Sequence, residues 1–119
     1  MMRPDCGLQE VYLCKQAVDF RKGINGLAVL VESVLELSPF SEHLFVFINR
    51  GRDKVKILYW EKSGFCLWQK RLEKERFKWP RHIEEHTIQL TGQQLNWLLD
   101  GYDLEKMKPH AALSYASVL

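Results

Sequence analysis

The sequence lacks the features that mark several large classes of protein. No apolar run reaches the ~18 residues of a membrane-spanning helix, and the first residues contain no apolar signal-peptide core. The three cysteines, Cys6, Cys14 and Cys66, are odd in number and widely spaced. They therefore form neither a disulfide framework nor a C-x-x-C motif. We expect reduced thiols, a cytoplasmic protein and no membrane partner.

Recognisable catalytic motifs are also missing. There is no P-loop, no G-x-S-x-G and no tight acidic cluster, and the aspartates are scattered at positions typical of turns and helix caps. His82 and His86 have the i, i+4 spacing of a metal-binding helix and would, with Glu85, be the basis of a small metal-dependent nuclease. However, their order does not match H-E-x-x-H, and the following residues 87–91 have an extended pattern. We predict no catalytic residue, no metal site and no cofactor.

The composition is that of one globular α+β domain. The 119 residues are 46% hydrophobic and 27% charged, and the net charge of +2 neither requires nor excludes nucleic acid. The lack of periodicity after Asp103 predicts a domain over residues 1–104 and a flexible tail over residues 105–119.

Hydrophobic periodicity predicts the order of the elements. Residues 10–15 resemble a short strand, and an amphipathic helix of about four turns follows, with Asp19 as N-cap and its end near Ser38. Residues 43–49, 54–61, 65–73 and 76–79 are strand-like and separated by short turns. Residues 91–101 read as a second helix, with a Thr91 and Gln94 capping box. The predicted fold is an antiparallel β-meander of about four to five strands, with one helix before it and one after it.

The parity of the hairpin turns assigns the side chains of the meander to two faces. The first face is almost purely apolar, with Lys70 its only misfit, and is expected to form the core beneath the first helix. It comprises Leu44, Val46, Ile48, Val55, Ile57, Tyr59, Cys66, Trp68, Leu72, Phe77 and Trp79. The second face combines aromatic and basic residues: Phe45, Phe47, Lys54, Lys56, Leu58, Trp60, Phe65, Leu67, Arg71, Arg76 and Lys78.

The second face has two possible roles. Aromatic rings that stack bases, beside cations that contact phosphates, are typical of sheets that bind nucleic acid. Alternatively, the second helix or a partner subunit covers its apolar part. Arg21 and Lys22 stand near the start of the first helix, where they would either assist phosphate binding or remain solvated, with Lys22 paired to Asp19.

Several stretches, taken together, resemble one family. The segments "DFRKGINGLAVLV", "HLFVFINRGRDKVKILYWEKSGFCLWQKRLEKERFKWP" and "LTGQQLNWLLDGYD" occur in the order typical of the Orf2-like accessory protein, TnpB, of insertion sequence family 66. The resemblance runs from about residue 8 to residue 104. The characteristic positions are Arg21, Lys22, Gly23, Gly26, Asn49, Arg50, Lys56, Trp60, Lys70, Arg71, Trp79 and Pro80.

The resemblance implies a bacterial, non-catalytic accessory protein of transposition, in which a separate, larger transposase performs strand transfer. One hypothesis is that the protein binds DNA at the element ends, or the transposase–DNA assembly. The candidate residues are Arg21, Lys22, Arg50, Arg52, Lys54, Lys56, Trp60, Arg71, Arg76 and Lys78. The alternative is a protein-interaction module that docks a companion protein or a second copy of itself through Phe45, Phe47, Leu58, Trp60, Phe65 and Leu67.

Overall fold

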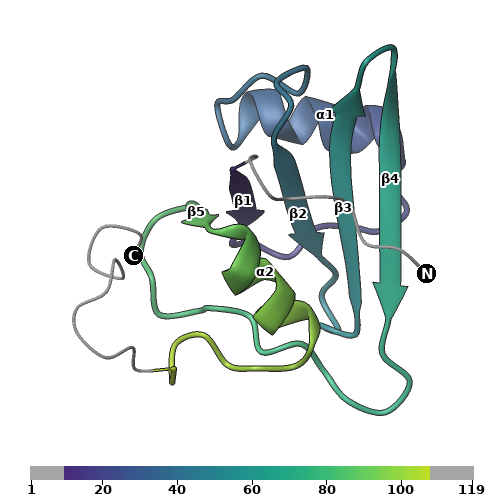
Figure 1. Ribbon diagram of the computed structural model, residues 1–119. Coiled ribbons are helices and arrows are strands. Elements are labelled where there is room, and N and C mark those ends of the chain that lie inside the picture. Colours follow the sequence, from purple (N-terminus) through teal and green to yellow (C-terminus); the bar gives the residue numbers. More distant parts are fainter. Residues whose placement is uncertain (1–9, 108–119) are drawn as a thin grey trace.

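The computed structural model describes residues 10–107, which form one mixed sheet and two helices (Figure 1). Along the chain the elements are β1 (Val11–Cys14), α1 (Ile24–Ser33), β2 (Leu44–Ile48), β3 (Lys54–Glu61), β4 (Gly64–Arg71), β5 (Thr87–Leu90) and α2 (Gly92–Leu99). The strand order across the sheet is β4-β3-β2-β1-β5. The predicted α+β class is confirmed, with one helix on either side of the meander in sequence.

One pair of strands departs from the antiparallel pattern. β2, β3 and β4 are antiparallel neighbours, whereas β1 lies parallel to β2 and antiparallel to β5. The parallel pair is possible because the chain between β1 and β2 contains α1, and two parallel strands need a long crossover connection.

The first helix is shorter than predicted. Gly23, not Asp19, is its N-cap residue, because residues 15–18 still follow the end of the sheet, where the Val18 amide donates to the Ile48 carbonyl at 2.9 Å. The helix ends well before Ser38, and Glu36 has a left-handed φ of 56°, a conformation that often terminates helices. In α2, by contrast, the predicted Thr91 and Gln94 capping box is present.

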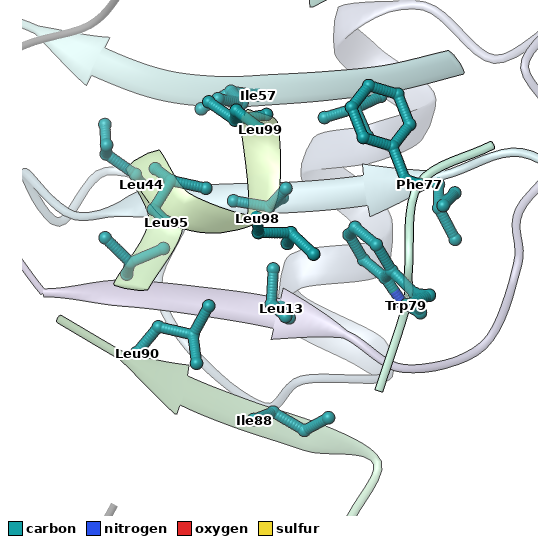
Figure 2. Close-up of a cluster of buried hydrophobic side chains, with 14 of the residues drawn as sticks. Leu13, Leu44, Ile57, Phe77, Trp79, Ile88, Leu90, Leu95, Leu98 and Leu99 are labelled. Atoms are coloured by element: carbon teal, nitrogen blue, oxygen red, sulfur yellow. The ribbon is translucent and has the colours of Figure 1, made fainter. Parts of the chain in front are cut away.

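The two faces of the sheet are those that hairpin parity predicts. Ile57 lies opposite Trp68, and Leu58 lies opposite Leu67, with Glu61 and Gly64 closing a tight turn. The assignment of the helices was wrong, however. The first face packs under α2, whose Leu95, Leu98 and Leu99 lie over Leu13, Leu44 and Ile57 (Figure 2). The other helix, α1, covers the second face instead. Strand parity determines which side chains share a face, but not which helix covers it.

Residues 76–79 do not form the predicted strand. The chain leaves the sheet after β4, and the Phe77 amide donates to the Arg52 carbonyl at 2.8 Å. Phe77 and Trp79 point into the core beside α2, where the Trp79 indole donates to the Cys14 carbonyl at 3.3 Å (Figure 2). The predicted burial of both rings is confirmed, although no ladder hydrogen bonds hold the segment.

Lys70, the misfit of the first face, has a structural partner. Its Nζ donates to the Leu99 carbonyl at 3.1 Å, at the last residue of α2. A cation at a helix C-terminus meets carbonyls that lack intrahelical partners and the negative end of the helix dipole. A single lysine on an apolar strand face therefore anchors the end of the helix that covers this face.

The chain after α2 also returns to the core. The Glu105 carboxylate accepts hydrogen bonds from the amides of Arg81 and His82, and Met107 packs against the apolar cluster under α2. Residues 105–107 were predicted to begin the flexible tail. The rest of that tail, residues 108–119, lies outside the described residues, as do residues 1–9 of the predicted domain.

Candidate nucleic-acid interface

The second face of the sheet divides into a basic end, a buried middle and an aromatic end. Lys54 and Trp60 stand at opposite ends of β3, and six residues of strand span about 20 Å. The basic and aromatic residues that the sequence assigned to one face thus share that face but not one location on it. What lies between them decides which residues can touch a ligand.

The middle of this face is core. Phe45, Phe47 and Leu58 have no exposed surface and pack against α1 residues that include Leu27 and Val31. Three of the six residues of the predicted partner-docking set are therefore enclosed within the molecule. A partner could reach them only if α1 moved away.

Lys56 belongs to the same buried middle. Only 8% of its surface is exposed, and its Nζ donates to the carbonyls of Phe20 and Lys22, each at 3.0 Å. The ammonium also lies 4.8 Å from the centroid of the Phe20 ring, a cation–π arrangement. This lysine fastens the loop before α1 to β3. We therefore leave it out of the surface that would contact phosphates.

The aromatic end consists of Trp60, Phe65 and Phe40. The ring centroids of Trp60 and Phe65 are 5.0 Å apart, and Phe40 lies 5.2 Å from Trp60 and 5.4 Å from Phe65. Phe40 is 57% exposed. Sequence reasoning missed Phe40, because it sits in the irregular loop between α1 and β2 and no periodic pattern connects it to the hairpin tip.

Three chain segments meet at the basic end. Lys54 lies opposite Arg71 in the ladder, the Arg76 Nε donates to the Gly51 carbonyl at 3.0 Å, and Lys56 holds Lys22. Twelve of the seventeen Lys and Arg residues of the chain, but only four of its fifteen Asp and Glu residues, lie in these segments, which are residues 15–22, 49–56 and 70–78. The net charge of +2 therefore conceals a strongly uneven distribution.

We call the solvent-accessible cations of this end the basic rim. Its members are Arg21, Lys22, Arg50, Arg52, Lys54, Arg71, Lys74, Arg76 and Lys78, all of them exposed or half-buried. Eight of these nine were predicted from the sequence, and Lys74 was missed because the turn that holds it was assigned no side-chain role. Of the predicted set, only Lys56 and Trp60 lie outside the rim.

Two hollows flank the hairpin loop between β2 and β3. The larger, of about 590 Å³, is bordered by residues 17–21, by Arg50 of the loop and by Lys54 at the start of β3. The smaller, of about 280 Å³, lies between the loop and residues 72–76. The loop therefore projects as a ridge with cations on both sides, a shape suited to contacts with a phosphate backbone.

A network of hydrogen bonds holds this loop. The Asn49 side chain donates to the Asp53 carboxylate at 2.7 Å and accepts from the Lys54 amide at 3.0 Å. The hydrogen bond from Asn49 is the main reason that the pKa of Asp53 is lowered. Arg52 has a left-handed φ of 62°, which completes the turn. The backbone that carries Arg50 is thus positioned before any ligand arrives.

Carboxylates within the basic rim are partly neutralised by its own arginines. The Arg21 guanidinium binds the Asp19 carboxylate at 2.6 Å, and these hydrogen bonds lower the pKa of Asp19 to about 2. Arg71 contacts Glu73 at 3.1 Å. Both pairs are exposed to solvent, where ion pairs contribute little and are easily exchanged for other partners. The Asp19 carboxylate thus pairs directly with Arg21, whereas Lys22 only adds a nearby positive charge.

The sequence matches a family model described as IS66 Orf2 like protein over residues 9–109. The chain belongs to this family. Two similar proteins from Sinorhizobium fredii (strain NBRC 101917 / NGR234) are uncharacterized. The one called y4jC is 33% identical over 108 residues, which cover 91% of each chain. The one called y4hO is 38% identical over 93 residues, which cover 78% of this chain and 80% of the relative. No solved structure matches the chain.

Membership of the IS66 Orf2-like family associates the protein with insertion-sequence transposition, as an accessory protein of a family that is not a known enzyme family. Within residues 10–107, no three His, Cys, Asp or Glu side chains are grouped so that they could hold a metal ion. His82 and His86 lie in the irregular segment before β5 rather than on a helix. Neither helix of the described chain is long and apolar enough to cross a membrane.

Proposed function

We propose that this IS66 Orf2-like protein is a non-catalytic accessory factor of transposition that binds DNA through the basic rim. The observation that carries the proposal is the convergence of three chain segments, which gathers most of the cations of a nearly neutral chain at one end of the sheet. Basic patches of this kind favour contacts with phosphates, which position a protein on the duplex without reading its sequence.

The proposed contact differs from a base-stacking sheet. Trp60 lies about 20 Å from Lys54 along β3, and the residues between them on this face are covered by α1 and by the loop before it. Stacking on Trp60 and phosphate contacts at the rim would therefore involve separate parts of a ligand. We assign the DNA contact to the ridge and its two hollows, with Arg50 at the centre and Arg76 and Lys54 on either side.

Charge reversal at the rim tests the proposal. Binding of duplex DNA carrying an element end is measured by fluorescence anisotropy between 50 and 200 mM salt, a range over which about six phosphate contacts reduce affinity by roughly 10³-fold. We expect the double variant Arg50→Glu/Lys74→Glu to bind at least about tenfold more weakly at low salt. The single variant Arg50→Ala should reduce the salt slope by about one.

A matched control changes the same total charge elsewhere. Lys62 lies at the opposite hairpin tip and Lys106 lies after α2, and both are exposed. The variant Lys62→Glu/Lys106→Glu should retain the affinity of the wild-type protein. Equal losses in both double variants, or no binding of wild-type protein to DNA at 50 mM salt, would refute DNA binding by the rim.

The aromatic end favours a second candidate function, docking of a companion transposition protein. The supporting observation is the exposed Phe40 ring, which extends the half-buried Trp60 and Phe65 onto the surface. Aromatic clusters of this kind are enriched in the energetically dominant centres of protein interfaces. Phe40→Ser is expected to abolish co-purification with the transposase of the element and to leave DNA affinity unchanged. Co-purification that persists would exclude this role for Phe40.

A further inference from the structure

The strand β4 forms one edge of the sheet, and its outer side has no partner strand among residues 10–107. With eight residues it is twice as long as β5 at the other edge. In an antiparallel pair, alternate residues direct their N–H and C=O groups away from the neighbouring strand. Because Glu61 and Gly64 close the two-residue turn, the outward residues of β4 are those with odd numbers, Phe65 to Arg71.

The first six residues of this edge lack the usual protection against pairing with another strand, and its two charges, Lys70 and Arg71, stand at the end of β4. Natural edge strands carry charges, prolines or bulges that prevent association. Residues 64–69 contain no charged residue and no proline, and the ladder to β3 is regular throughout. Phe65 and Leu67 on one face, and Cys66 and Trp68 on the other, are all half-buried. A strand laid beside β4 would cover the remaining surface of all four.

We propose that β4 pairs with β4 of a second copy of this chain, antiparallel and about a two-fold axis. An isologous contact requires that the same strand be complementary to itself. With Trp68 opposite its symmetry mate, Gln69 lies opposite Leu67, and Arg71 lies opposite Phe65 of the other copy. Each outward residue then pairs with another outward residue, so both sets of backbone groups are satisfied.

Charge complementarity favours this register, and it favours a second copy of the chain as the partner. The cation at the end of each strand meets the aromatic end of the other, where Phe65 and Trp60 are only half-buried and the Arg71 guanidinium would contact them as a cation–π pair. No two like charges of β4 stand directly opposite each other. Arg71 is available for the contact, since its present pair with Glu73 is exposed, with 59% and 73% of the side chains accessible.

The dimer would join the two sheets into one and direct the basic rims away from each other. Each rim lies at the end of β4 that contains Arg71, and antiparallel strands place these ends on opposite sides. In this register the two Arg71 positions lie six residues apart along the paired strands, about 20 Å, so one dimer would present two separate rims. Provided that the rim binds DNA as proposed above, the dimer bridges two duplexes.

The oligomeric state of the full chain, measured by light scattering during size-exclusion chromatography, tests the pairing without DNA. We expect twice the 14.1 kDa of one chain. Gln69→Pro removes an outward N–H, leaves the inward ladder to β3 intact and should yield a monomer. Gln69→Thr keeps this N–H and should remain a dimer. If the proline variant fails to fold, Gln69→Lys provides a second test. The position is exposed, and a lysine there should weaken the dimer.

A monomeric wild-type protein, or a Gln69→Pro variant that is folded and dimeric, would overturn the inference.

Bridging is measured separately, by capture of a fluorescent duplex on beads that carry a second duplex. The wild-type protein should capture it, and Gln69→Pro should bind one duplex but lose capture. If the rim variants retain DNA binding while the protein is a dimer, the proposed function fails and the pairing stands.

Discussion

Lys56→Glu is expected to destabilise the protein by about 3–5 kcal/mol, measured as the free energy of unfolding in urea. The native ammonium is buried and donates to the carbonyls of Phe20 and Lys22. A carboxylate in its place would face two carbonyl oxygens and have no donor, so an uncompensated charge would remain buried. We expect the loop before α1 to detach, or the chain to unfold at low urea concentration.

Lys54 supplies the matched control, because it lies two residues away on the same face of the same strand. It is half-buried at the rim. Lys54→Glu should change stability by no more than about 0.5 kcal/mol, as is usual for surface substitutions, while it weakens DNA binding. If Lys56→Glu instead left stability unchanged and reduced only DNA affinity, the structural role of Lys56 would be wrong and its original assignment as a phosphate contact would return.

Phe47→Ala is expected to cost about 3–5 kcal/mol in the same measurement. The ring belongs to β2 and is fully buried under α1. Its removal would therefore leave a cavity that the surrounding side chains cannot fill. Phe40→Ala is the control. More than half of its ring surface is already exposed, and it should lose less than about 1 kcal/mol. Equal stability of Phe47→Ala and wild-type protein would mean that α1 does not cover this face in solution.

These two experiments separate the buried middle of the second face from its accessible ends. Without them, a loss of function in a Lys56 or Phe47 variant would be attributed to a missing contact with DNA or with a partner. With stability measured first, only rim and aromatic-end variants remain informative about binding. The choice of residues for mutagenesis thus depends on which face of the sheet α1 covers. The periodicity of the strands does not predict this.

The register of the meander was predictable from the sequence because it depends on short-range geometry. A tight turn of two residues joins β3 to β4, both strands alternate, and a one-residue slip would move every side chain to the other face. The pairing of Trp60 with Phe65, and of Lys54 with Arg71, follows from this alone. The capping box of α2 is equally local, since the Thr91 hydroxyl and the Gln94 amide lie within one helical turn.

The positions of the helices and of the irregular segments were not predictable in this way. Residues 76–79 carry the alternation of a strand, but the Phe77 amide donates to the Arg52 carbonyl of a loop and no ladder forms. The side of the sheet that α1 covers depends on the path of residues 15–23, which no periodic pattern describes. Phe40, Lys74 and Asn49 gained their roles from contacts between segments that are distant from one another or that were read only as loops.

The sequence by itself determined the α+β class, the family, the two faces of the meander and most of the cations that we propose to bind DNA. Local patterns carry this information, because side-chain alternation and turn length act over a few residues. Only the tertiary structure decided that α1 buries Phe47 and Leu58, that the loop before α1 covers Lys56, and that Trp60 stands apart from the basic rim. Such choices depend on packing between segments tens of residues apart, where the free energy of burying apolar surface, and not any local preference, selects the arrangement.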